Sequence, residues 1–164
     1  MEPTAKVERT HKLVELVTFY LGDTLYGIDI RKVQEINKLK EWTPVPYAED
    51  FVKGILSLRG SIVMILDLSQ KLGLATTVVT DHTRNIIITS ADQQCMGFLV
   101  DSIGSVTHVP WDQVCDPPAV VNGVHGRHLE GVFKTDTDLI AILDVDEVFS
   151  AVETKTEVSL PAKG

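Results

Sequence analysis

Cysteine, positive charge and long apolar runs are all scarce in this chain of 164 residues. Its two cysteines, Cys95 and Cys115, lack metal-ligand spacing, and so few cysteines favour a reducing cytosol over a secreted disulfide scaffold. Fifteen Lys and Arg stand against 23 Asp and Glu, and the net charge of −8 argues against nucleic acid as a partner. The apolar runs are far shorter than the roughly 20 residues of a membrane span, and the polar N-terminus has no signal-peptide core. We therefore expect a cytoplasmic protein that does not insert into the membrane.

Motifs that carry catalysis or bind a cofactor are missing as well. The chain has no glycine-rich phosphate loop, nucleophile elbow or zinc signature. His125 and His128 lie close together but have no Cys or acidic cluster beside them, which argues against a metal pair. Four aspartates are better explained by an exposed turn and a helix cap than by a cation site: Asp136, Asp138, Asp144 and Asp146. We expect a protein without enzyme activity, metal or cofactor.

What the chain does contain is a repeat, in which a segment that starts at Gly54 recurs 77 positions later. Gly54 matches Gly131, and Asp67 matches Asp144. In both copies, runs of branched apolar residues around a turn predict a β-hairpin. The Asp stands three residues before an amide or acid, which is the spacing of a capping box, so each hairpin should lead into a helix.

Only the turn of this hairpin fails to repeat. It spans Ser57 to Gly60 (Ser-Leu-Arg-Gly) in the first copy and Lys134 to Thr137 (Lys-Thr-Asp-Thr) in the second. Gly60-Ser61 suits a tight turn, because Gly reaches positive φ without steric cost. Arg59 is either a solvated turn residue or a group retained for a partner. The core pattern is therefore kept while the exposed turn differs.

The chain ahead of the hairpin repeats more weakly, at a spacing of 70 that matches Gly27 with Gly97. Short β-rich segments flank Gly22-Asp23, a two-residue signal for a hairpin turn. Because about five short strands with turn signals fall in each half, we predict a mainly β fold of two small antiparallel β-barrels related by internal duplication. Each barrel is too small to be stable alone, so we expect the two to share an interface.

The predicted organisation is one folded domain at 13–153 with a flexible tail at each end, 1–12 and 154–164. Within the domain, the first barrel takes about 13–80. The second barrel takes about 81–153.

Helices are expected to be few and short. One should lie over Val33 to Ile36, because apolar residues fall at helical spacing after Asp29, a candidate N-cap. A C-terminal helix should run from Asp144 to about Glu153. Trp42 and Trp111 are either anchors for a partner or covers of the core.

Several stretches closely resemble the CheW family of bacterial chemotaxis coupling proteins. They are Leu21 to Ile30, Val33 to Ile36 (Val-Gln-Glu-Ile), Gly54 to Val63, which holds Leu-Arg-Gly, and Leu66 to Leu68 (Leu-Asp-Leu). The resemblance covers roughly 16–149, and its Arg-Gly hairpin is specific to the family. The chain departs from the family pattern at Ser57, where Asn is usual, and at Met64, where Pro is usual.

The resemblance implies a non-catalytic adaptor made of two SH3-like barrels. Such an adaptor acts in two-component signal transduction and couples the cytoplasmic tip of a chemoreceptor, a methyl-accepting chemotaxis protein, to a CheA-type histidine kinase. The implied location is cytoplasmic, at receptor arrays on the inner face of the membrane. Two other interpretations stay open: a CheW-like regulatory piece of a larger kinase or receiver-linked protein, and an unrelated small-barrel ligand-binding protein or enzyme.

The family match and the asymmetric turn together predict where the partners bind. The receptor site is expected on the first barrel, at Val33, Glu35, Ile36, Gly54, Leu58, Arg59 and Gly60. The regulatory domain of the kinase is expected on the second barrel, at Gly97, Phe98 and Val100. Arg59 and Glu35 should also form an ion pair, since both charges are lost together in the second copy, which has Asp136 and Ser105 instead.

Overall fold

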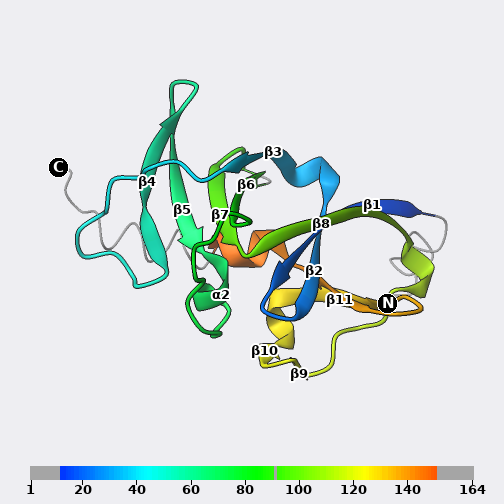
Figure 1. Ribbon diagram of the computed structural model, residues 1–164. Coiled ribbons are helices and arrows are strands. Elements are labelled where there is room, and N and C mark those ends of the chain that lie inside the picture. Colours follow the sequence, from blue (N-terminus) through cyan, green and yellow to red (C-terminus); the bar gives the residue numbers. More distant parts are fainter. Residues whose placement is uncertain (1–11, 91, 151–164) are drawn as a thin grey trace.

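Two five-stranded sheets form the body of the protein, which a computed structural model describes for residues 12–90 and 92–150 (Figure 1). Sheet A has the order β11 (Leu129–Lys134), β12 (Leu139–Leu143), β2 (Thr24–Asp29), β1 (Leu13–Leu21) and β8 (Ser102–Pro110). Sheet B has the order β3 (Val33–Lys38), β6 (Arg84–Thr89), β7 (Cys95–Val100), β5 (Ser61–Asp67) and β4 (Val52–Leu58). The fold is mainly β, as the sequence predicts. Apart from Lys12, the two predicted tails lie outside the described residues.

Each sheet takes strands from both halves of the chain. The β1–β2 hairpin lies in sheet A between β8 and β12, and the β6–β7 hairpin lies in sheet B between β3 and β5. The predicted division into barrels at 13–80 and 81–153 is therefore wrong, because the two repeats exchange their first hairpins. Most strand pairs are antiparallel, as predicted, but β12 with β2 and β5 with β7 are parallel.

The repeat itself is confirmed in the strand register. In sheet B, Ile65 of β5 lies opposite Gly54 of β4 on one side and Gly97 of β7 on the other. In sheet A the same row is formed by the residues that the repeat matches to these three: Ile142, Gly131 and Gly27. The spacings of 77 and 70 thus mark positions that are equivalent in space.

Each sheet curls into a barrel, because a segment that follows one outer strand joins the other outer strand. In sheet B, Thr43 follows β3 and exchanges two backbone hydrogen bonds of 2.8 Å with Ile55 of β4. In sheet A, Cys115 and Val132 exchange a matching pair of 2.9 Å. A Cβ on Gly54 would collide with the carbonyl oxygen of Thr43, so the closing segment requires glycine there. We call the closed sheets barrel A and barrel B.

The main apolar core lies between the two sheets. It combines Phe19 and Tyr26 of sheet A with Phe98 of sheet B. A smaller cluster fills each barrel, and Trp42 packs on the one in barrel B while Trp111 packs on the one in barrel A. The predicted shared interface is therefore confirmed, and both tryptophans cover apolar clusters.

Aspartates begin the helices, as predicted. Asp67 accepts a hydrogen bond from the backbone N–H of Gln70 at 3.3 Å and starts α2 (Leu68–Lys71). Asp144 accepts one from the N–H of Glu147 at 3.2 Å and starts a helix at 145–150. The remainder of the predicted C-terminal helix, 151–153, lies outside the described residues.

Val33 to Ile36 belong to strand β3 and not to the predicted helix. Asp29 does cap a helical turn by accepting from the N–H of Arg31 at 2.9 Å, but the turn is the single 3₁₀ turn η1 (Ile30–Lys32). The chain is extended from Val33 onwards, and β3 pairs with β6. Pairing with a neighbouring strand gives these β-branched side chains a pleated surface on which they pack well, and it overrides the helical spacing.

The long connection between β8 and β11 contains short elements of its own. It begins with the 3₁₀ turn η2 (Trp111–Gln113) and ends with η3 (Gly126–His128). Between them, β9 (Val120–Val121) and β10 (Val124–His125) form a two-stranded ribbon.

Candidate functional site

The turn of the β4–β5 hairpin projects from barrel B, at the top of the view in Figure 1. Arg59 and Gly60 are its two central residues, with φ of 52° and 84°. Positive φ at both positions is the type I′ geometry, whose twist matches the twist of the flanking strands. The turn therefore lies one residue earlier than the predicted Gly60-Ser61, because Ser61 already pairs with Leu58 in the ladder.

The predicted ion pair between Arg59 and Glu35 is confirmed. Arg59 Nη1 donates to Glu35 Oε1, and the side chains are 70% and 19% exposed. Glu35 lies on β3, and Arg59 follows β4, so the pair joins the two outer strands of sheet B at the mouth of the barrel. A pair this exposed adds only about 0.2 to 1 kcal/mol of stability, so its main effect is to orient the guanidinium.

The second carboxylate oxygen of Glu35 accepts a hydrogen bond from its own strand. Asn37, two residues along β3, donates from Nδ2 to Glu35 Oε2 at 2.9 Å. Both carboxylate oxygens thus have a donor, one from the turn and one from the strand. The Arg59 side chain presents its remaining donors to solvent, where a planar fork of N–H groups suits a partner carboxylate.

The other predicted receptor residues divide into exposed and buried ones. Ile36 and Gly60 are exposed, and Ile36 keeps 40% of its surface accessible. Val33 is half-buried against the main core, while Leu58 and Gly54 are buried in barrel B. Val33, Leu58 and Gly54 therefore support the exposed residues from the interior of the protein.

Ile62 is a surface residue that sequence reasoning missed. It lies opposite Ser57 near the end of the hairpin and is 66% exposed. No clear signal was present in the sequence, because Ile62 begins an unbroken apolar run to Leu66, which is typical of a strand buried on both faces. Ile36 and Ile62 are thus two exposed apolar side chains of barrel B.

The predicted kinase-binding residues are core residues. Gly97, Phe98 and Val100 are all buried in β7, which has β6 on one side and β5 on the other. Phe98 belongs to the main core, and Ile65 packs over Gly97. The prediction that they contact a partner is wrong, because an apolar run flanking a glycine marks a strand buried on both faces. They also lie in the same barrel as Arg59.

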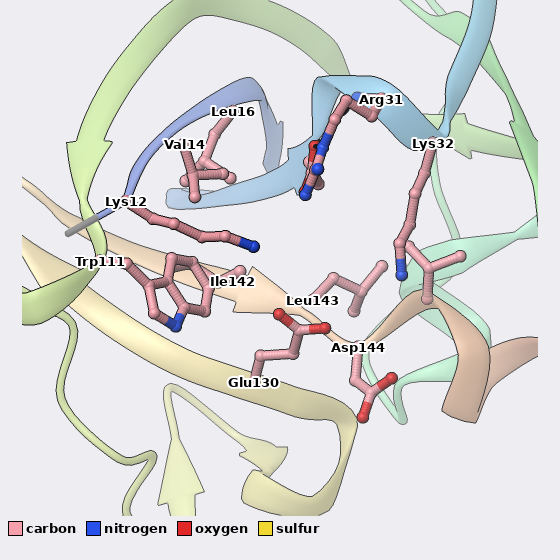
Figure 2. Close-up of a pocket in the computed structure, with 12 residues that line it drawn as sticks. Lys12, Val14, Leu16, Arg31, Lys32, Trp111, Glu130, Ile142, Leu143 and Asp144 are labelled. Atoms are coloured by element: carbon pink, nitrogen blue, oxygen red, sulfur yellow. Dashed lines mark hydrogen bonds and ion pairs between the residues drawn. The ribbon is translucent and has the colours of Figure 1, made fainter. Parts of the chain in front are cut away.

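A cavity of about 590 Å³ opens at the mouth of barrel A (Figure 2). Figure 2 shows the amines of Lys12 and Lys32 and the carboxylate of Glu130 directed toward it. Its lining combines five aliphatic side chains with one indole and six charged groups: Trp111, Lys12, Asp29, Arg31, Lys32, Glu130 and Asp144. The lining includes no Ser, Thr, Cys or His among the described residues, so it offers no hydroxyl or thiol nucleophile with a neighbouring base.

Opposite charges are paired around this cavity. Arg31 binds Asp29 through two hydrogen bonds of 2.7 and 3.1 Å, and Lys32 Nζ lies 3.3 Å from Asp146 Oδ2. Burial raises the pKa of Asp29, but the hydrogen bonds and charge of Arg31 outweigh burial and hold that pKa below its usual value. The ion pair with Arg31 therefore favours the charged form of Asp29 at the rim of the cavity.

Neither a metal centre nor a membrane span is found in the part of the chain that the structure describes. Among residues 12–90 and 92–150, no three His, Cys, Asp or Glu side chains lie close enough together to hold a metal ion. The His125 and His128 rings meet edge to face at 6.4 Å, and His128 is hydrogen-bonded to Glu147. None of the described helices is long and apolar enough to cross a bilayer.

Comparisons with a family model, with known sequences and with solved structures all point to the same family. The model of the CheW-like domain matches residues 15–153. Chemotaxis protein CheW of Treponema pallidum is 32% identical over 149 residues, which are 89% of this chain and 88% of that protein. CheW of Bacillus subtilis is 28% identical over 155 residues, or 94% and 97% of the two chains. The crystal structure of scaffolding protein TtCheW from Thermoanaerobacter tengcongensis superposes with a TM-score of 0.77 at 30% identity, covering 84% of this chain and 88% of that one.

Proposed function

The chain belongs to the CheW-like family, and we propose that it is a non-catalytic adaptor that couples chemoreceptors to a CheA-type histidine kinase in chemotaxis. The match over 15–153 includes both barrels, and the relatives are chemotaxis proteins of similar length. Binding to the cytoplasmic tips of receptors would place the adaptor at the inner face of the membrane.

The observation that carries the receptor half of the proposal is the asymmetry between the two hairpin turns. Arg59 and Glu35 form an ion pair at one turn, whereas the matching positions hold Asp136 and Ser105. The same barrel also exposes the apolar side chains of Ile36 on β3 and Ile62 on β5. A receptor helix hairpin binds such a surface through spaced apolar anchors and takes its orientation from charges at the rim.

The kinase half of the proposal uses the equivalent surface of barrel A. Because Gly97, Phe98 and Val100 are buried, contacts must come from other residues. The repeat matches Ile36 with Val106 on β8 and Ile62 with Leu139 on β12, and both are exposed. The receptor and the kinase can then bind without competing, since each barrel presents its own exposed apolar residues.

Receptor binding can be tested with the cytoplasmic fragments of the chemoreceptors of the same bacterium. Calorimetry should show binding to at least one fragment, and Arg59→Ala should weaken it severalfold. Asp136→Ala is the matched control, because it changes the corresponding turn of barrel A and should leave receptor affinity unchanged. Equal losses in the two variants, or none in either, would contradict the receptor site.

Coupling can be tested by adding the protein to receptor fragments and the kinase. We expect kinase autophosphorylation to respond to the receptor only when the adaptor is present. Val106→Asp should weaken kinase binding but not receptor binding, and Ile36→Asp should do the reverse. If one substitution abolishes both interactions in a folded protein, the two partners do not use separate barrels.

A further inference from the structure

Three polar residues of barrel B are hydrogen-bonded in series up to its exposed turn, and a fourth, Asn85, lies next to the series without joining it. Asn85 on β6 is 2% exposed and lies directly opposite Asn37 on β3. Asn37 donates to Glu35, and Glu35 accepts from Arg59. A buried asparagine inside a small apolar barrel is unusual, since polar side chains are rarely buried without need.

The matching positions of barrel A hold different residues, and the one that matches Asn85 is apolar. Leu16 pairs with the residue two positions after Gly27, just as Asn85 pairs with the residue two positions after Gly97. Leu16 is completely buried, so this barrel position accepts leucine. Asn37, Glu35 and Arg59 correspond by the repeat to Thr107, Ser105 and Asp136. Barrel A is thus also polar at three of these positions, but it has neither the buried asparagine nor the Arg–Glu pair of the barrel that carries the arginine turn.

Both asparagines leave an oxygen unpaired. Oδ1 of Asn37 and Oδ1 of Asn85 are buried without a hydrogen-bond partner. An unpaired buried carbonyl oxygen destabilises the fold, and an apolar residue of similar shape avoids that loss. Fold stability alone therefore does not explain Asn37, whose amide turns its N–H group to Glu35 while its oxygen stays unpaired.

We infer that Asn37 is a positioning residue of the receptor site, and the inference rests on the function proposed above. By binding Glu35 Oε2, Asn37 fixes the carboxylate so that Oε1 faces the turn, where it meets Arg59 Nη1. Asn37 touches no partner itself and acts through the direction of the guanidinium. Asn85 is the control position. Its side-chain oxygen is also buried and unpaired, but it lies opposite Asn37 and not opposite Glu35, whose partner across the strands is Ile87.

The test measures binding of a chemoreceptor cytoplasmic fragment to the full chain carrying Asn37→Leu, Asn85→Leu or Arg59→Ala. Asn37→Leu should weaken binding about threefold to tenfold, the range expected for one hydrogen bond. Asn85→Leu should leave the affinity unchanged. In the Arg59→Ala background, Asn37→Leu should have no further effect, because the group that it positions is gone.

Two results would overturn the inference while leaving the proposed function intact. One is wild-type affinity for Asn37→Leu when Arg59→Ala weakens binding. The other is an equal loss for Asn85→Leu, which would assign the effect to the barrel interior in general. Unchanged affinity for Arg59→Ala would instead remove the receptor site as well. If Asn37→Leu does not fold, Asn37→Val replaces it, since valine suits a strand and has no donor for Glu35.

Discussion

His128 Nδ1 and Glu147 Oε1 lie 2.8 Å apart and connect the start of β11 to the C-terminal helix. His128 is 5% exposed, so its ring depends on this bond in an environment that water does not reach. The backbone oxygen of the same histidine accepts from the N–H of Asp144, the residue that caps the helix. One residue therefore fixes the helix through both its side chain and its main chain.

Glu147→Ala should destabilise the protein by about 1 to 3 kcal/mol, because it leaves a buried ring nitrogen without a partner. Glu15→Ala is the matched control, since Glu15 pairs with His108 at 2.9 Å but both side chains are about half exposed. That exposed pair should contribute at most about 1 kcal/mol. Urea unfolding of the two variants measures the difference, and equal losses would contradict the importance of burial.

Arg59→Asn should separate folding from binding. Asn accepts positive φ better than Arg, and Asn-Gly is the preferred sequence for a type I′ turn, so the new turn should gain about 0.5 to 1 kcal/mol. This gain offsets the lost ion pair, whose contribution is of similar size. We expect a melting temperature close to that of the wild type and receptor affinity as weak as that of Arg59→Ala. Full affinity in the Asn variant would mean that the turn shape, and not the guanidinium, is recognised.

Gly97→Ala should destabilise the fold more than Gly27→Ala. A Cβ at Gly97 would lie 2.6 Å from Ile65 Cδ1, whereas one at Gly27 would lie 3.0 Å from Leu16 Cδ1. Overpacking of this kind typically costs about 1 to 3 kcal/mol. The two glycines are equivalent by the repeat, so thermal unfolding of the pair isolates the difference in clearance. The opposite order would show that barrel B relaxes more easily than barrel A.

Tyr26 should make the protein sensitive to alkaline pH. Burial raises the pKa of its hydroxyl from 10.0 to about 12. The unfolded chain therefore loses this proton before the folded protein does, and stability falls as the pH rises from about 10 to about 12. The loss for this group is about 2 to 3 kcal/mol. Tyr26→Phe should flatten the pH dependence of unfolding over this range, and parallel curves for the two proteins would contradict the assignment.

The repeat allowed much of the fold to be predicted but not the exchange of hairpins. Matching Gly27 with Gly97 identifies equivalent strands, yet it does not say which copy a hairpin pairs with. Val33 and Ile36 suit a helix and a strand equally well over so short a segment, and only pairing with β6 decides between them. Spacing within the sequence carries no information on such distant pairing.

The candidate site was predicted where the two copies differ and missed where they agree. Arg59 and Glu35 could be linked because both charges are absent from the second copy, and the structure brings them together. Phe98 and Val100 are predicted as kinase contacts from the family resemblance, but both are buried in the core. Burial depends on which strands flank β7, and these come from distant parts of the chain.

The exchange of hairpins also governs the order in which the chain can fold during synthesis. When β1 and β2 leave the ribosome, their neighbours β8 and β12 have not yet been made, and β3, β4 and β5 wait for β6 and β7. Sheet B becomes complete once Val100 has emerged, but sheet A must wait for Leu143. A chain cut within 76–81 would therefore yield two fragments that each lack strands for both sheets, and the fragments should fold only when mixed.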